Sequence, residues 1–249
     1  MIVLKSEREL AKMREAGALT AKVLQEVAAM VKPGVKTREL DRKAEELVAR
    51  YGVKAAFKGY RGYPASICVS VNEEVVHGIP GDRVLQEGDI VSLDFGVIYE
   101  GFYGDSAVTV PVGEISSEAQ KLLKVTKEAL EKGISQAQIG NRLSDISHAV
   151  QTHVEENGFA VVREYVGHGI GREMHEAPPV PNFGLPNRGP RLKVGMTLAI
   201  EPMVNVCTWE VKSLADGWTV VTKDGSLSAH FEHTVAITED GPEILTKWD

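Results

Sequence analysis

Two apolar runs separated by a turn form the clearest hydrophobic pattern in the chain. Residues 90–99 are mostly β-branched or aromatic, and residues 102–110 continue in the same way. Only Glu100-Gly101 separates the two runs, and a two-residue loop of this kind is typical of a β-hairpin. The pattern therefore predicts two antiparallel strands in which Tyr99 faces Phe102.

Two acids interrupt this apolar hairpin. In the predicted register Asp94 pairs with Ala107, which lies two residues from Asp105, so both carboxylates lie on one face of the ribbon. Adjacent like charges repel unless a proton or a cation lies between them. The hairpin thus indicates a divalent-metal site, although an exposed sheet face with two solvated acids would need no metal.

Apolar residues at helical spacing predict helices before and after the hairpin. The first helix follows a capping box that begins at Ser6, and we expect Thr37 to cap the second. After the hairpin, a capping box at Ser117 starts a third helix, and a fourth ends at Gly158. A short strand is expected over 67–71.

The order helix, helix, strands occurs twice. Residues 85–94 resemble residues 192–201, which aligns Asp94 with Glu201. Asp105 aligns in the same way with Glu232. The repeat predicts an α+β fold in which residues 1–249 form one domain. Two pseudo-symmetric halves, about 1–112 and 113–249, would pack about a pseudo-two-fold axis, and two pairs of helices would cover one side of a curved antiparallel sheet.

One irregular stretch lies late in the chain. Residues 177–191, APPVPNFGLPNRGPR, are rich in Pro and Gly. We expect them to form an ordered surface loop beside the functional site rather than a domain boundary.

Composition narrows the functional classes. The net charge of −7 without an obvious basic patch argues against nucleic acid as a partner. The two cysteines, Cys68 and Cys207, exclude a disulfide scaffold and a thiolate-rich metal site, and they fit a reducing compartment. The N-terminus has no apolar signal segment and no run approaches membrane-spanning length. We therefore expect a cytoplasmic protein that does not bind membranes.

The candidate metal ligands come from both halves. Four carboxylates and one imidazole are too few for a calcium cage of oxygens and too many for one tetrahedral zinc. They suit two transition-metal ions that share bridging carboxylates and activate a water between them. These residues are Asp94, Asp105, His168, Glu201 and Glu232.

Short motifs along nearly the whole chain resemble those of the methionine aminopeptidases, specifically the short bacterial-type type I enzymes. That family has the duplicated "pita-bread" metallopeptidase fold, in agreement with the repeat. The motifs are VHGIPGD at 76–82, DFG at 94–96, GDSA at 104–107, GHGIG at 167–171, MHEAP at 174–178, IEP at 200–202 and FEHT at 231–234.

The resemblance implies a role for each metal ligand. Asp105 and Glu232 bridge two divalent ions, Asp94 holds one of them, and His168 with Glu201 completes the other. The family and the donor set together allow Co, Mn, Fe or Zn. A weaker similarity, at Asn72, Glu74 and Ser228, implies a possible monovalent-cation site.

The resemblance also implies catalytic and substrate-binding residues. Glu201 accepts the proton of the attacking water, while His77 and His175 hydrogen-bond the scissile amide and steady the tetrahedral intermediate. An apolar, polarizable pocket suits the unbranched methionine thioether. Besides the two histidines, its residues are Phe57, Tyr60, Tyr63, Cys68, Met174 and Trp218.

The implied reaction is N-terminal methionine excision during protein maturation. Substrates are nascent chains with a small second residue, and the family leads us to expect a monomer that associates transiently with the ribosome. One alternative is an Xaa-Pro aminopeptidase or prolidase, which shares fold and ligands but normally adds a large N-terminal domain. Another is a non-catalytic pita-bread binding protein, whose relatives usually lose metal ligands that are all present here.

Overall fold

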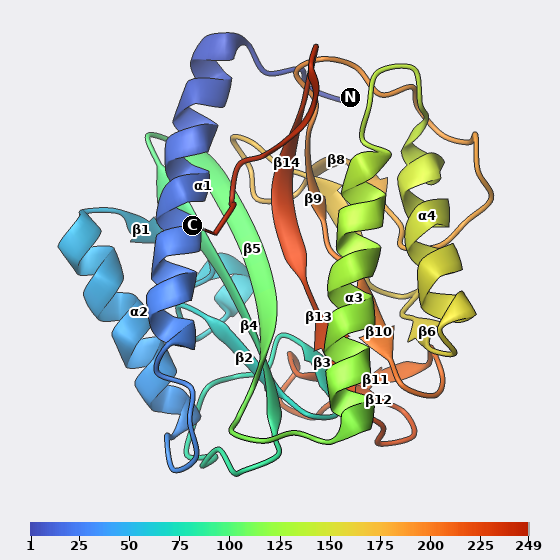
Figure 1. Cartoon of the computed structure of the whole chain (residues 1–249). Coiled ribbons are helices and arrows are strands. Elements are labelled where there is room, and N and C mark those ends of the chain that lie inside the picture. Colours follow the sequence, from blue (N-terminus) through green and yellow to red (C-terminus); the bar gives the residue numbers. More distant parts are fainter. Residues whose placement is uncertain (249) are drawn as a thin grey trace.

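A curved antiparallel sheet, covered on one side by helices, forms the centre of the molecule (Figure 1). The computed structural model describes residues 1–248. The arrangement confirms the predicted α+β class, and the helices and strands follow one another in the expected order.

The predicted hairpin is confirmed in its register. Strand β4 (Ile90–Tyr99) pairs with β5 (Phe102–Pro111), Tyr99 lies opposite Phe102, and Asp94 lies opposite Ala107. Both loop residues, Glu100 and Gly101, have positive φ, at 46° and 80°. A tight two-residue turn between right-twisted strands requires this backbone conformation.

The strand order of the main sheet is pseudo-symmetric. Its path is β1-β4-β5-β14-β9-β7-β8, with β2 also paired to β4 and β15 to β14. A β4-β5 pair from the first part of the chain thus lies against a β14-β9 pair from the second, as a duplicated fold predicts. The further bounds are β1 (Lys54–Ala55), β2 (Cys68–Val71), β7 (Gly167–Gly169), β8 (Glu176–Val180), β9 (Thr197–Ile200), β14 (Glu232–Thr238) and β15 (Gly241–Ile244).

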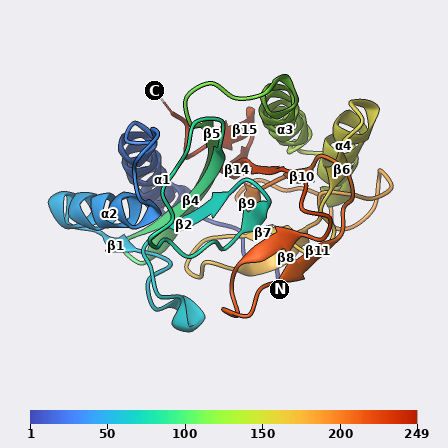
Figure 2. The same ribbon diagram turned by 90° about the horizontal axis from the view of Figure 1, so that it is seen from below.

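Two helix pairs cover the outer side of the sheet (Figure 2). The first pair is α1 (Glu7–Ala28) and α2 (Thr37–Tyr51), and the second is α3 (Ser117–Ser135) and α4 (Leu143–Glu156). Each pair buries its apolar face against its own strands and forms a separate core. Leu24 and Leu40 pack with Leu93 in one core, whereas Leu122 and Ile146 pack with Leu198 in the other.

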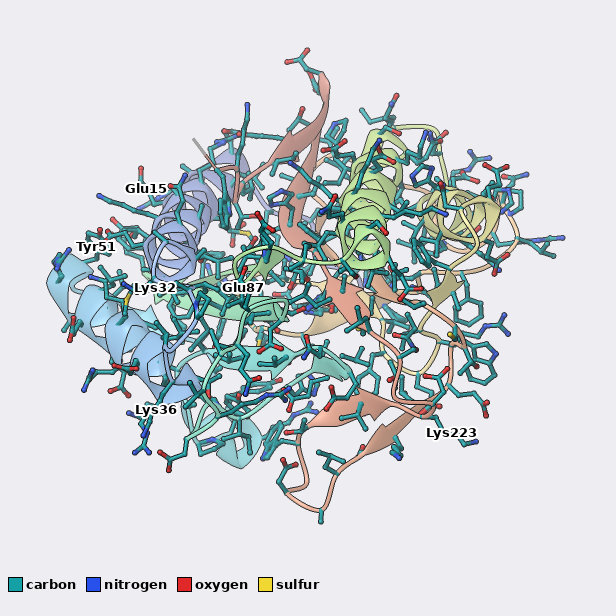
Figure 3. The ribbon with its side chains drawn as sticks, turned by 60° about the horizontal axis from the view of Figure 1, so that its bottom comes forward. Glu15, Lys32, Lys36, Tyr51, Glu87 and Lys223 are labelled. Carbon is teal, nitrogen blue, oxygen red and sulfur yellow. The ribbon has the colours of Figure 1, made fainter. Side chains whose placement is uncertain are left out.

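Two small sheets extend the concave side. One contains β3 (Glu74–Val76), β11 (Val211–Ser213) and β12 (Val220–Thr222), and the other contains β6 (Ala160–Val161), β10 (Met203–Asn205) and β13 (Ser228–His230). Figure 3 shows Lys223, just after β12, at the outer edge of this region, where its Nζ lies 2.8 Å from Glu210 Oε1. The turn between β11 and β12 carries Trp218, and a 3-10 turn, η1 (Tyr60–Gly62), follows β1.

Two predicted helix caps are wrong by one residue. Helix α2 begins at Thr37, so Lys36 is its N-cap. Helix α3 begins at Ser117 and is capped by Ser116, whose Oγ accepts a hydrogen bond from the Ala119 N–H at 3.1 Å. At α3 the adjacent hydroxyls of Ser116 and Ser117 are equally good capping groups, and only the backbone path selects one of them.

The predicted loop 177–191 is wrong in its first four residues. Residues 177–180 belong to β8, where Pro179 pairs with His168. Proline lacks the N–H that a central strand needs, but β8 is the last strand of the sheet path and tolerates it. The remainder is a loop that reaches the site only at its start, where Asn182 Nδ2 donates to the Glu201 carbonyl at 3.0 Å. Further along, the N–H groups of Asn187 and Arg188 donate to Asp145 and Ser144 at the start of α4.

No helix within residues 1–248 combines the length and apolar character that crossing a membrane requires.

Gly104 allows α1 to lie directly on β5, next to Asp105. A Cβ at Gly104 would come within 2.8 Å of the Ala16 carbonyl carbon, and Thr20 Oγ1 donates to the Gly104 carbonyl at 3.2 Å. We expect Gly104→Ala to lower the free energy of unfolding by about 1–3 kcal/mol through overpacking. Urea denaturation of the full chain measures this loss.

The matched control is Gly81→Ala, because a Cβ at Gly81 meets nothing within 4 Å. We expect this variant to stay within about 0.5 kcal/mol of the wild type. Equal losses in both variants would contradict the close-approach argument.

Candidate active site

Strand register brings three carboxylates onto one face of the sheet. Asp94 on β4 and Glu232 on β14 both pair with Ala107 on β5, so the three residues form a row across the sheet. Asp105 lies two residues before Ala107 and faces the same way. The alignment predicted for the hairpin acids therefore extends to a third strand.

Two further side chains join this face from the neighbouring strands. Ile200, the last residue of β9, pairs with His233, so Glu201 follows directly and lies beside Glu232. His168 on β7 pairs with Ala199, two residues before Glu201, and shares its face. The structure thus brings together all five side chains that the sequence suggested as metal ligands.

The imidazole of His168 points at the carboxylates. Its Nε2 lies 3.5 Å from Glu201 Oε1 and 4.0 Å from Asp105 Oδ2. Its Nδ1 lies 2.9 Å from the Gly169 carbonyl and donates a hydrogen bond to it, which leaves the Nε2 lone pair free. A backbone carbonyl commonly orients a metal-binding histidine in this way.

Unpartnered oxygens show that the cluster fits divalent metal ions. Asp94 Oδ1, Asp105 Oδ1 and Glu232 Oε1 are buried without a hydrogen-bond partner in the described part of the chain. Ligand atoms of Asp105, His168 and Glu232 lie within 4.8 Å of one another. Buried carboxylate oxygens are rarely left alone in proteins, and a shared cation satisfies several at once.

Burial controls the protonation of this cluster. Loss of solvation raises the pKa of Asp94 to about 7 and that of Glu201 to about 8. Burial, reinforced by the neighbouring carboxylates, raises the pKa values of Asp105 and Glu232 well above their usual range. Burial lowers the pKa of His168 to about 3, so this ring is neutral and keeps a lone pair for a metal.

The acids form the floor of a cavity of about 180 Å³ whose wall is apolar. Phe57, Tyr63, Cys68 and Met174 are buried in this wall and pack as one cluster. Trp218 is half-buried and meets the Tyr63 ring edge-on, with centroids 5.1 Å apart. Every residue predicted to bind substrate lines this cavity, including Tyr60 at its rim.

The two outer histidines both line the cavity. His77 follows β3 with φ at 61°, an unusual conformation for a residue with a side chain, and burial lowers its pKa to about 4. His175 precedes β8, and its ring centroid lies 4.2 Å from that of His168. Its Nδ1 shares a hydrogen bond with the Tyr60 hydroxyl at 2.9 Å.

The residues suggested for a monovalent cation have other partners. Asn72 and Ser228 are adjacent, because the Ser228 N–H donates to the Asn72 carbonyl at 3.0 Å. Glu74 uses both of its oxygens, since Oε2 accepts a hydrogen bond from the Val71 N–H at 2.7 Å and Oε1 pairs with Arg83 at 3.0 Å. The cation site stays a prediction.

Sequence reasoning gave no role to several side chains of the site, among them Tyr165, Arg61 and His230. Tyr165 lines the cavity and meets the His77 ring edge-on at 5.7 Å, yet it stands outside every motif. Arg61 also lines the cavity and lies over the Tyr60 ring at 5.4 Å; its place in the GYRGYP loop was the available signal. His230 lies against Glu201 and Glu232, and its only signal was its position directly before FEHT.

Comparisons with known proteins agree with this geometry. Residues 11–239 match metallopeptidase family M24. Methionine aminopeptidase 1 of Bacillus subtilis is 58% identical over 99% of this chain and 100% of its own length. Methionine aminopeptidase of Clostridium acetobutylicum is also 58% identical, covering 99% of both chains. The crystal structure of methionine aminopeptidase from Thermotoga maritima has a TM-score of 0.98 at 52% identity and covers 99% of this chain and 100% of that one.

The chain therefore belongs to metallopeptidase family M24, and within that family to the methionine aminopeptidases. Prolidase from Pyrococcus furiosus is more distant, with 22% identity and a TM-score of 0.80, and this chain covers 66% of it. At that identity the likeness shows a shared fold. The Xaa-Pro peptidase alternative thus describes a distant relative, and the non-catalytic alternative does not fit relatives at 58% identity that are named methionine aminopeptidase.

We expect metal binding to release protons. Asp94 and Glu201 have pKa values of about 7 and 8 without metal, so both carry protons near pH 6 that a divalent ion must displace. Affinity for Mn(II) should rise between pH 6 and pH 8. Calorimetry in two buffers of different ionisation enthalpy counts the released protons.

Asp240→Asn is the control, because Asp240 is exposed between β14 and β15 and does not line the cavity. This variant should release as many protons as the wild type. Equal metal affinity of the wild type at pH 6 and pH 8 would refute the expectation.

Proposed function

We propose that this protein removes the N-terminal methionine from nascent proteins and peptides whose second residue is small. The observation that carries the proposal is one cavity that joins a carboxylate-rich floor to a sulfur-containing apolar wall. Relatives named methionine aminopeptidase at 58% identity support the same activity. We further propose that the protein acts in the cytoplasm as a monomer that associates transiently with the ribosome.

Two divalent ions would be held by the five predicted ligands. Asp105 and Glu232 would bridge them, Asp94 would hold one, and His168 with Glu201 would complete the other. Co, Mn, Fe or Zn suits a site rich in oxygen with imidazole. Bound there, the ions would lower the pKa of a water and polarise the scissile carbonyl.

Side chains of the protein would move and hold the protons. Glu201 lies at the floor of the cavity and would take a proton from the attacking water and pass it to the leaving amine. His77, neutral because burial lowers its pKa to about 4, would donate a hydrogen bond to the scissile amide. His175, which also lines the cavity, would stabilise charge on the tetrahedral intermediate.

The apolar wall would select the first side chain. Cys68 and Met174 present sulfur, and Phe57 and Tyr63 present aromatic faces, to a pocket of soft, polarizable surface. Burial raises the pKa of the Cys68 thiol well above its usual value, so this residue contributes packing rather than a thiolate. Tyr60 and Trp218 would close the pocket toward solvent.

We propose that residues 1–249 act as a single catalytic domain with halves of about 1–112 and 113–249. Support comes from the sheet, because β4-β5 and β14-β9 are hydrogen-bonded neighbours. Asp249 lies outside the described residues.

The test of the reaction uses three tripeptides and protein stripped of metal. We expect methionine release from Met-Ala-Ser after addition of Co(II) or Mn(II), and far less from Met-Leu-Ser. Chromatography of the free amino acids measures both. Cleavage of Ala-Pro-Ser instead would assign the protein to the proline peptidases, and inactivity of folded, metal-loaded protein would overturn the proposal.

Replacement of His175 tests the outer histidines. We expect His175→Ala to lower kcat for Met-Ala-Ser by about 10²–10³-fold with a small change in KM, because a donor to the developing charge is lost. His148→Ala is the matched control, since His148 lies on α4 against the Gly184 carbonyl and away from the cavity. An unchanged kcat in His175→Ala would remove His175 from the mechanism.

A further inference from the structure

His230 is a buried histidine at the end of β13. Its exposed fraction is 1%, and its backbone is held on both sides. Met203 on β10 pairs with it, while its N–H donates to Thr109 Oγ1 and its carbonyl accepts from the same hydroxyl, both at 2.9 Å. These contacts fix the position of the His230 backbone, and so of the Cβ from which the ring extends.

Neither ring nitrogen of His230 has a hydrogen-bond partner in residues 1–248. Nε2 instead faces two of the proposed metal ligands, at 3.6 Å from Glu201 Oε2 and 3.9 Å from Glu232 Oε2. Both distances exceed a hydrogen bond. They fit the spacing of ligands on one ion, since two atoms that each lie about 2.0–2.2 Å from a shared metal can be up to about 4 Å apart.

His168 makes the same kind of approach from the other side. Its Nε2 lies 3.5 Å from Glu201 Oε1, whereas the Nε2 of His230 lies 3.6 Å from Glu201 Oε2. The two imidazoles thus approach different oxygens of the Glu201 carboxylate. Ligand atoms of Glu201, His230 and Glu232 also lie within 4.8 Å of one another, as do those of Asp105, His168 and Glu232.

We propose that His230 is a sixth metal-ligating side chain, which binds one ion through Nε2 together with Glu201 and Glu232. This inference rests on the metal centre of the proposed function. It changes the donor set to four carboxylates and two imidazoles. A second nitrogen favours ions with a strong preference for imidazole, such as Zn(II) or Co(II), over Mn(II).

The test counts imidazole ligands in the full-length protein loaded with Co(II). Each histidine bound to Co(II) through one nitrogen gives a strongly shifted, exchangeable N–H resonance in the proton spectrum. We expect two such resonances in the wild type and one in His230→Leu and His230→Gln. Chelator competition should also show at least about tenfold weaker binding of one Co(II) ion in both variants.

His233→Gln is the matched control. His233 also neighbours Glu232 on β14, but its Nδ1 lies 2.9 Å from Thr246 Oγ1. This variant should keep both resonances and the wild-type affinity for Co(II). His230→Gln retains a polar side chain. If His230→Leu does not fold, the number of shifted N–H resonances in the wild type still tests whether His230 binds the metal.

The outcomes separate this inference from the proposed function. A wild type that binds Co(II) and releases methionine but shows one shifted imidazole would overturn the role of His230 alone. A folded wild type that binds no Co(II) would overturn both. Unchanged Co(II) affinity in both His230 variants would likewise contradict direct ligation.

Discussion

The crowding of four carboxylates on one sheet face, with Asp105 and Glu232 buried, is the constraint on which the rest of the molecule depends. Their mutual repulsion and lost hydration would push the strands apart unless the backbone held them. Side chains lock β5 to β14 at this point. Thr234 Oγ1 accepts from the Asp105 N–H at 3.0 Å and donates to the Asp105 carbonyl at 2.8 Å, and Ser106 Oγ donates to the Glu232 carbonyl at 2.7 Å. The sheet therefore keeps the ligands in place at a cost that cations offset.

The other parts of the cavity, its apolar wall and outer histidines, come from segments near the ends of the strands. Loops at the strand ends supply the apolar wall and the outer histidines, while the helices on the far side support the strands without entering the site (Figure 2). A cavity of about 180 Å³ with a polar floor and a largely apolar wall has room for one side chain beside the acids.

Short-range sequence patterns predicted those features of the fold that neighbouring residues determine, such as turns and strand register. The two-residue loop fixed the register of β4 and β5, and through it the meeting of Asp94 and Asp105. Cap positions failed by one residue at Ser116, because adjacent hydroxyls are equivalent until the chain path is known. The strand at 177–180 was missed because proline weighs against a strand unless it lies at an edge. His230 was not predicted as a site residue, because its contact with Glu201 depends on the tertiary packing of β13 and no sequence pattern marks it.

The pseudo-symmetric order β4-β5-β14-β9 has an evolutionary consequence. Each half contributes one acid from its inner strand, β5 or β14, and one that lies in or directly after the neighbouring strand, β4 or β9, so the ions would lie at the junction of the two halves. Two identical copies of such a unit, paired as a homodimer, would already present four converging acids. Fusion of the copies into one chain then frees each to diverge. The apolar wall, to which the first half contributes Phe57, Tyr63 and Cys68 and the second half Met174, is an asymmetry that such a fusion permits.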